Sequence, residues 1–157
     1  MLALQESLHA RDEFGSFFIV RACFPKLFAA IVAQLKTRLT VSVVSTAGTG
    51  KSTFLFYFAT RYVRLHRNQR VLVRVPKDDS SFLFSSRATP TGVEVSVLAS
   101  TFQRFERERG DNSVLQLIDG CNGITVLPPA GLRAVGFFSP RTYTKDHGEW
   151  QKVSFDL

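Results

Sequence analysis

The order of apolar and polar residues predicts strands and helices that alternate along most of the chain. Short apolar runs rich in β-branched residues are typical of buried strands, and they occupy residues 41–44, 71–75, 114–118 and 134–138, with a fifth candidate strand at 153–155. Apolar residues three or four positions apart predict helices over residues 24–38, 51–66 and 93–109, the last with a strand-like beginning. We interpret the polar residues 77–91 as a surface loop. This alternation predicts a mainly parallel sheet covered on both faces.

The helix predicted over residues 24–38 has a clear apolar stripe. Pro25 suits its first turn, and the stripe comprises Leu27, Phe28, Ile31, Val32 and Leu35. A stripe of this kind packs on a sheet or lies on a membrane surface, and the core-facing interpretation is the commoner one. We therefore divide the chain into an N-terminal segment, residues 1–40, whose amphipathic helix packs on the core, and a domain over residues 41–157.

Residues 41–53, with the sequence VSVVSTAGTGKST, are the stretch around which the chain is organised. A strand, a glycine-rich turn and a helix follow one another here, which is the context that a phosphate-binding loop (P-loop) requires. The glycines can adopt backbone angles closed to other residues and leave room for a phosphate. Backbone N–H groups then form an anion nest at the positive end of the following helix. The expected nucleotide-binding residues are Ala47, Gly48, Thr49, Gly50, Lys51, Ser52 and Thr53.

Lys51 and Ser52 carry the chemistry expected of this loop. Lys51 would reach the β- and γ-phosphates as a catalytic cation, and the Ser52 hydroxyl would ligate Mg²⁺. The usual pattern is G-x-x-x-x-G-K-[ST]. Ser45 occupies its first glycine position, where we expect some backbone strain. A strand–turn–helix joint with a solvent-facing lysine is the plainer alternative.

A second carboxylate is needed beside such a loop to hold the hydration shell of magnesium. Asp119 follows the strand at 114–118, at the edge where ligands bind in open α/β sheets, so we expect it to be a metal-side and catalytic residue. A turn before Gly120 is the plainer alternative. Gly120 stands where many hydrolysing P-loop proteins carry a water-activating glutamate, and this predicts slow hydrolysis. Ser139, which ends the next strand, is placed either to sense the γ-phosphate or to begin a turn.

The remaining polar side chains carry weaker signals. Three carboxylates could supply a base, although nothing places them near the loop: Asp78, Asp79 and Glu94. Three arginines could stabilise charge, but a solvated helix face explains them better: Arg104, Arg107 and Arg109. The histidines lack the spacing of metal ligands, and the two cysteines are too few for a disulfide framework or a zinc site: His9, His66, His147, Cys23 and Cys121.

Length and charge limit the classes of protein. A chain of 157 residues fits one domain with a sizeable core, and it is short for a nucleotide-hydrolysing domain with a lid, so we expect a minimal or truncated one. The formal charge of +7 favours contact with polyanions such as nucleic acid. No uncharged apolar run reaches roughly 18 residues, and no secretory signal is visible. Reduced cysteines suit an intracellular protein of the cytoplasm or nucleus.

The loop and the aspartate strand also carry a resemblance to a known family. Residues 18–24, FIVRACF, resemble the F-x-V-R-x-C-Y entry segment of Crinkler-type and retrotransposon-hot-spot-type P-loop ATPases. Residues 45–57 are similar to the family loop with its Phe-Leu-x-Tyr continuation. Residues 117–120 and 139–140 are similar to the ends of two family strands. Ser45 and Ala47 depart from the family loop. The resemblance, over roughly residues 17–157, implies an ATPase module that in Crinkler-like effectors is usually joined to a C-terminal nuclease-like or kinase-like domain.

These observations predict a three-layer α/β/α P-loop NTPase. The first hypothesis is a Mg²⁺-dependent ATP-binding module with slow or partner-stimulated hydrolysis, in which ATP and Mg²⁺ are the cofactors. The alternative is a nucleotide-switched or degenerate module that contacts nucleic acid or a partner protein. A small-molecule kinase is a third, weaker hypothesis because the sequence shows no recognisable lid or acceptor pocket. No membrane partner is expected, and an arginine supplied in trans would require an oligomer.

Overall fold

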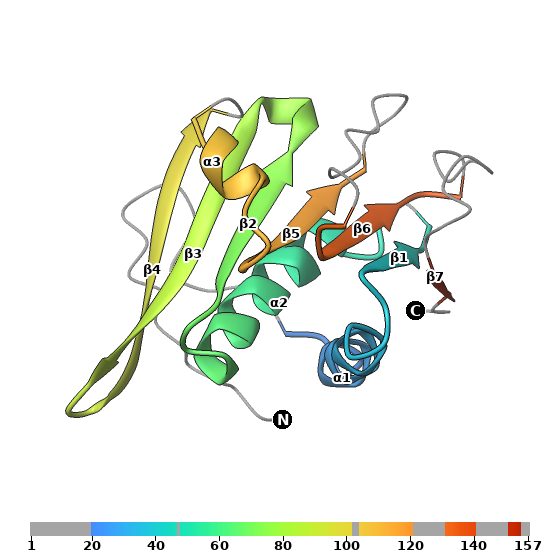
Figure 1. Cartoon of the computed structure of the whole chain (residues 1–157). Helices are drawn as coiled ribbons and strands as arrows, with labels where there is room; N and C mark the ends of the chain where they lie inside the picture. Colours follow the sequence, from blue (N-terminus) through green and yellow to red (C-terminus); the bar gives the residue numbers. More distant parts are fainter. Residues whose placement is uncertain (1–19, 47, 102–103, 121–130, 141–150, 155–157) are drawn as a thin grey trace.

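The structure is a computed structural model, and it describes residues 20–46, 48–101, 104–120, 131–140 and 151–154. Its helices are α1 (Phe24–Gln34), α2 (Lys51–Leu65) and α3 (Glu106–Arg109), with a 3₁₀ turn η1 (Pro76–Asp78). Its strands are β1 (Thr40–Val44), β2 (Arg70–Val75), β3 (Ser80–Thr89), β4 (Gly92–Thr101), β5 (Val114–Asp119), β6 (Ala134–Phe138) and β7 (Gln151–Ser154). The strands form one sheet in the order β4-β3-β2-β5-β6-β1-β7 (Figure 1).

Most of the predicted elements are confirmed close to their expected bounds. The helix predicted over 24–38 ends at Gln34, and the helix after the glycine loop covers 51–65. The four predicted strands correspond to β1, β2, β5 and β6. β7 lies at 151–154, so it overlaps the fifth candidate strand, whose last residue, Phe155, is outside the described residues.

The sheet is mixed, and the prediction of a mainly parallel sheet is wrong. β2, β5, β6, β1 and β7 pair in parallel, whereas β2–β3 and β3–β4 are antiparallel. The antiparallel hairpin covers the predicted surface loop at 77–91 and most of the predicted helix at 93–109. Its cause lies in the period-two alternation of Val93, Val95 and Val97, which is typical of a strand with one half-buried face. These valines decide the structure of the segment, and only residues 106–109 are helical.

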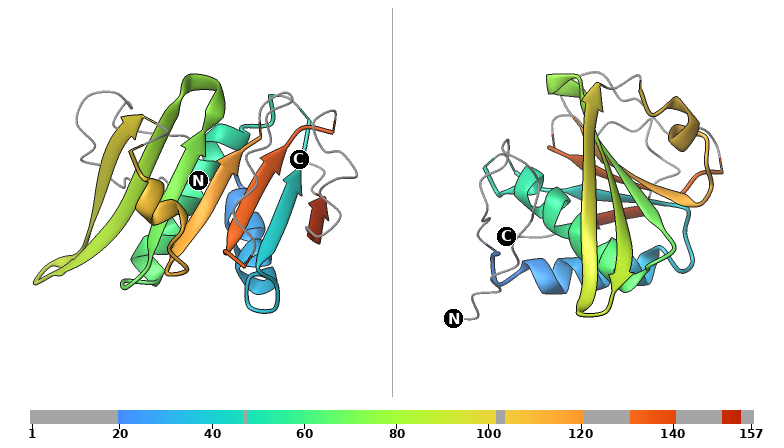
Figure 2. Two further views of the ribbon diagram at one scale, coloured as in Figure 1. Left: turned by 45° about the horizontal axis from the view of Figure 1, so that its top comes forward. Right: turned by 90° about the vertical axis from the view of Figure 1, so that its left-hand side faces the viewer.

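The two long helices pack on the same face of the sheet. Phe24 and Phe28 of α1 and Phe54 and Phe58 of α2 are buried in one core with the alternate strand residues that point toward them. Phe105, at the start of α3, instead packs against Leu72, Val114 and Leu83, whose side chains lie on the opposite face. Figure 2 shows α3 on the side of the sheet away from α1 and α2. In the described part of the chain α3 is the only helix on that second face, so a three-layer arrangement is not established.

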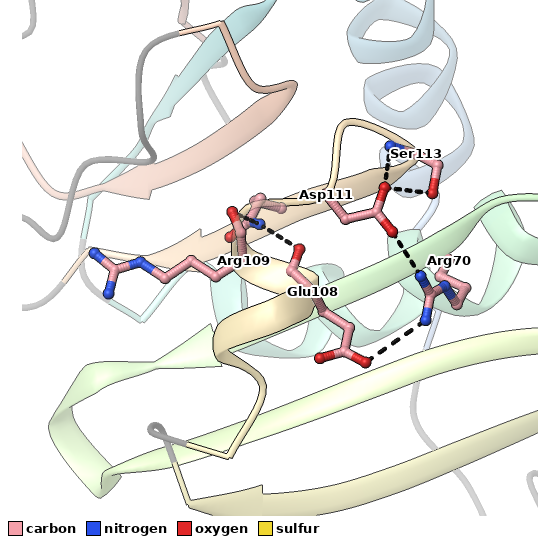
Figure 3. A network of polar contacts seen from close by, with 6 residues as sticks. Arg70, Glu108, Arg109, Asp111 and Ser113 are labelled. Atoms are coloured by element: carbon pink, nitrogen blue, oxygen red, sulfur yellow. Dashed lines mark hydrogen bonds and ion pairs between the residues drawn. The ribbon is translucent and has the colours of Figure 1, made fainter.

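Polar contacts hold α3 against this second face (Figure 3). Arg70 of β2 donates a hydrogen bond to Asp111 Oδ2 at 2.8 Å, and its other nitrogen lies 3.6 Å from Glu108 Oε1. The buried Gln116 of β5 donates through Nε2 to the backbone oxygens of Glu108 and Arg109. These carbonyls lie in the last turn of the helix, where no intrahelical donor is available. Side chains of two strands therefore fix the position of this short helix.

None of the helices in the described ranges combines the length and the apolar character that crossing a membrane requires.

Candidate functional site

The candidate site lies where three neighbouring parallel strands end. β6 pairs with β1 on one side and with β5 on the other, so their carboxyl ends meet at one edge of the sheet (Figure 1). β1 leads into the glycine loop, β5 ends at Asp119, and β6 is followed by Ser139. The aspartate strand is therefore separated from the loop strand by a single strand, β6.

The glycine loop has the backbone conformation that its sequence predicts. Gly48 has φ +77° and Gly50 has φ +83°, a left-handed region that favours glycine. Gly50 is also the N-cap residue of α2, and its carbonyl accepts a hydrogen bond from Phe54 N at 2.8 Å. No acidic residue occupies the first turn of the helix, so nothing there offsets the positive end of the helix dipole. Ala47 lies outside the described residues.

Ser45 stabilises the loop instead of straining it. Asp79 is the only non-glycine residue with a positive φ among the described residues, so the prediction of backbone strain at Ser45 is wrong. The Ser45 side chain is buried, and its hydroxyl lies 2.9 Å from Thr49 Oγ1. Thr49 Oγ1 in turn donates to the Thr46 carbonyl at 2.9 Å. A serine at the first glycine position thus closes a hydrogen-bonded brace across the loop.

Replacing Ser45 with alanine is expected to lower the free energy of unfolding by about 1 kcal/mol, because the brace loses one hydrogen bond at a buried site. Urea denaturation measures the change. Ser96→Ala, at an exposed position of β4, is the matched control and should change stability by less than about 0.5 kcal/mol. Equal effects at the two serines would mean that the Ser45 hydroxyl does not hold the loop.

Lys51 folds back onto the beginning of the loop. Its Nζ donates to the carbonyl of Ser45 at 2.9 Å and to the carbonyl of Thr46 at 2.6 Å. Burial lowers the pKa of this ammonium from its ordinary value, and the Asp119 carboxylate acts in the opposite direction. A partly desolvated cation held by neutral carbonyls gains from an anion that enters the loop. The side chain is long enough to exchange its carbonyl partners for such an anion.

Ser52 and Asp119, which the sequence separates by 67 positions, meet at this edge. Ser52 Oγ donates to Asp119 Oδ2 at 3.1 Å. These are hard oxygen atoms of the kind that Mg²⁺ prefers, and Mg²⁺ commonly takes one or two protein ligands and completes its shell with phosphates and water. Within the described ranges no three His, Cys, Asp or Glu side chains form a metal-binding group. A metal ion between Ser52 and Asp119 would take its remaining ligands from bound phosphates and water. Thr53, next in the helix, is half-buried.

Gly120 occupies a place that has no room for a side chain. A Cβ there would lie 2.7 Å from Phe138 Cε1, closer still to Phe138 Cδ1, and 2.8 Å from the Phe137 carbonyl oxygen. The amide of Gly120 donates to that same carbonyl at 2.7 Å, which ties the backbone in place. The glutamate that would activate water at this position cannot be accommodated. The sequence shows the glycine, but only the packing shows why it is required.

Arg21 is a residue of the site to which the sequence analysis gave no role, although it lies in the entry segment 18–24. Its Nη1 donates to the Thr49 carbonyl at 2.9 Å, and a Cβ at Gly50 would lie 3.4 Å from its Cζ and Nε. The side chain therefore lies against the middle of the glycine loop, although 28 positions separate the two in sequence. One available signal was an arginine at the entry of α1, within residues 20–77, which contain no aspartate or glutamate.

The structure does not bring the other candidates to the loop. Asp78 and Asp79 follow β2, and Glu94 lies in β4, so β5 and β6 stand between them and β1. Arg107 and Arg109 belong to α3, on the face of the sheet opposite α2. His66 packs on Tyr62 at the far end of α2, and burial together with the charge of Arg133 lowers its pKa. His9, His147 and Cys121 lie outside the described residues, and Cys23 is a free, half-buried thiol at the N-cap of α1.

Comparison with family models, curated proteins and solved structures found no match to this chain. The functional inference therefore rests on the residues of the loop edge and their geometry.

Proposed function

We propose that the chain is a P-loop NTPase module that binds ATP with Mg²⁺ and hydrolyses it slowly or with the help of a partner. One observation carries the proposal. A glycine loop with two left-handed glycines opens α2, and Lys51 and the hydrogen-bonded pair Ser52–Asp119 lie at the same edge of the sheet. The resemblance to the ATPase part of Crinkler-type effectors is consistent with this proposal.

The loop would hold the phosphates mainly through its backbone. Amides at the first turn of a helix have no intrahelical acceptor, and together with the helix dipole they bind anions. Lys51 would leave the carbonyls of Ser45 and Thr46 and contact the β- and γ-phosphates. Ser52 and Asp119 would hold the magnesium ion and its water, and the ion would neutralise charge on the same phosphates.

Slow hydrolysis follows from the neighbourhood of Asp119. Fast hydrolysis needs a group that orients or deprotonates the attacking water, and Gly120 leaves no space for a carboxylate directly after Asp119. The group would have to come from another segment or from a partner. Ser139 follows β6, between the loop strand and the aspartate strand, where a hydroxyl could contact the γ-phosphate.

A titration with a fluorescent ATP analogue, with and without Mg²⁺, tests the proposal. We expect Mg²⁺-dependent binding by the parent chain and no measurable binding by Lys51→Ala, because the main cation of the phosphate site is lost. Lys36→Ala, an exposed lysine in the turn after α1, is the control for loss of charge alone. Thermal unfolding of both variants without ligand confirms that they fold. Binding of the analogue by Lys51→Ala as tightly as by the parent would overturn the assignment of the site.

A nucleotide-switched or degenerate module that contacts nucleic acid or a partner protein is the second candidate. It is favoured by the basic charge of residues 20–77, where lysine and arginine occur without any aspartate or glutamate. DNA affinity that falls steeply with added salt and does not respond to nucleotide would favour this candidate.

A further inference from the structure

The N-terminal segment contributes a charged side chain to the glycine loop. Arg21 is exposed and stands at the entry of α1, where its own carbonyl accepts a hydrogen bond from Phe24 N at 3.0 Å. Its guanidinium donates to the Thr49 carbonyl at 2.9 Å and lies alongside Gly50. The backbone of Arg21 is thus anchored to the helix, while its side chain reaches the loop.

The bond to Thr49 has a geometric consequence for the next amide. The carbonyl of one residue and the N–H of the following residue point in opposite directions across a trans peptide, and the described residues contain no cis peptide. When Arg21 holds the Thr49 carbonyl toward itself, the Gly50 N–H must point to the other side of the loop. Charge assistance strengthens the bond to the carbonyl and polarises the peptide.

The side chain of Thr49 holds the same peptide from a second direction. Thr49 Oγ1 lies 2.9 Å from both Ser45 Oγ and the Thr46 carbonyl. Thr49 lies between two glycines, which would otherwise leave this part of the loop free to rotate. Arg21 and the Thr49 brace together therefore restrict the orientation of this peptide.

We propose that Arg21 is a positioning residue for the polyphosphate of a bound nucleotide. Arg21 fixes the Thr49–Gly50 peptide so that the Gly50 N–H points into the anion nest, and its charge adds positive potential behind that amide. This inference rests on the proposed nucleotide site. Because Arg21 acts through the loop backbone, it affects the phosphate chain and not the base, so its removal should weaken ATP, GTP and inorganic triphosphate by the same factor.

The test compares the parent chain with Arg21→Ala, Arg21→Lys and Lys51→Ala. The matched control is Arg38→Ala, an exposed arginine in the turn after α1. Dissociation constants for ATP, GTP and inorganic triphosphate are measured in Mg²⁺ by competition with the fluorescent analogue. We expect Arg21→Ala to weaken all three by about tenfold or more, as for a charge-assisted hydrogen bond. Arg38→Ala should bind as the parent does.

Two further measurements separate positioning from a general structural role. Added guanidinium at millimolar concentration should restore part of the affinity of Arg21→Ala, because it can occupy the vacated place at the Thr49 carbonyl, and it should not restore Lys51→Ala. Arg21→Lys keeps the charge but has a single ammonium in place of the planar fork, so it should bind more tightly than Arg21→Ala and less tightly than the parent. Melting temperatures without ligand should be unchanged in both Arg21 variants.

The outcomes distinguish this inference from the proposed function. If the parent binds no polyphosphate, the proposed function fails and the role of Arg21 fails with it. If the parent binds, Lys51→Ala does not, and Arg21→Ala binds as the parent does, the nucleotide site stands and the positioning role is overturned. Loss of ATP affinity with unchanged affinity for inorganic triphosphate would also overturn it, because Arg21 would then contact the base or the sugar.

Discussion

Replacing Gly120 with glutamate is expected to lower the free energy of unfolding by about 3 kcal/mol or more, at the upper end of the cost of overpacking. We do not expect the new carboxylate to act as a base for hydrolysis. The change looks attractive because it would put a carboxylate next to Asp119. The first atom of any side chain would nevertheless overlap the ring of Phe138 and the carbonyl of Phe137. Phe138 is buried, and the Gly120 amide is bonded to Phe137, so neither the ring nor the backbone can easily move away.

Alanine and glutamate at this position separate the effect of the Cβ from that of the carboxylate. Gly120→Ala should already lose about 2 kcal/mol or more, since the overlap involves only the Cβ. Gly110→Ala is the matched control, because a Cβ there would meet only the Arg107 carbonyl at 3.9 Å, and its effect should stay within about 0.5 kcal/mol. Urea denaturation measures all three variants. A Gly120→Glu chain that is as stable as the parent and hydrolyses ATP faster would disprove the steric explanation.

For the proposed function, the consequence is that this edge of the sheet would hold a nucleotide more readily than it would cleave it. Gly120, whose amide donates to the Phe137 carbonyl of β6, occupies the position where a base would have to stand. Any acceleration by a partner would therefore need to bring in a new group.

Local sequence patterns predicted the elements around the site well because each of them is a buried and largely apolar run. β1 and α2 flank a glycine loop whose two left-handed residues are both glycine, so strand, turn and helix were all readable from neighbouring residues. The hairpin of β3 and β4 was missed for the opposite reason. The polar residues of β3 suggested a loop, and the spacing of later apolar residues suggested a helix in place of β4. Phe82 and Phe84 on the core-facing side of β3 and the alternating valines of β4 decide the structure instead.

The residues that complete the site could not be predicted because they depend on contacts between distant segments. Arg21 reaches Thr49 only after α1 has packed beside the loop strand. The role of the Ser45 hydroxyl depends on a particular loop conformation, and its sequence position suggested only a departure from the usual pattern. The meeting of Ser52 and Asp119 was expected from the general behaviour of parallel strands, and the sequence alone could not give their hydrogen bond.

The second large effect is expected at Phe54, which joins the loop helix to the rest of the core. Its ring lies 5.1 Å from that of Phe24 in α1 and 5.8 Å from that of Phe137 in β6, and the side chain is buried. These three phenylalanines also line a pocket beneath the loop, together with Gly50 and Lys51 among others. Phe54→Ala should lower the free energy of unfolding by about 3–5 kcal/mol, because it removes a buried ring and enlarges this pocket.

Phe56→Ala separates the general cost of losing a ring from a specific effect on the loop. Phe56 lies in the same helix but is only partly buried and packs on Phe82 and Phe84 of β3. The decrease in the free energy of unfolding, measured by urea denaturation, should therefore be clearly smaller for Phe56→Ala. Phe54→Ala should also weaken polyphosphate binding, measured without urea, where the variant is folded. The first turn of α2 then loses its contact with α1, and the loop loses the support of Arg21. Equal stability losses at the two positions, or unchanged polyphosphate affinity in a folded Phe54→Ala, would show that the loop does not depend on the packing beneath it.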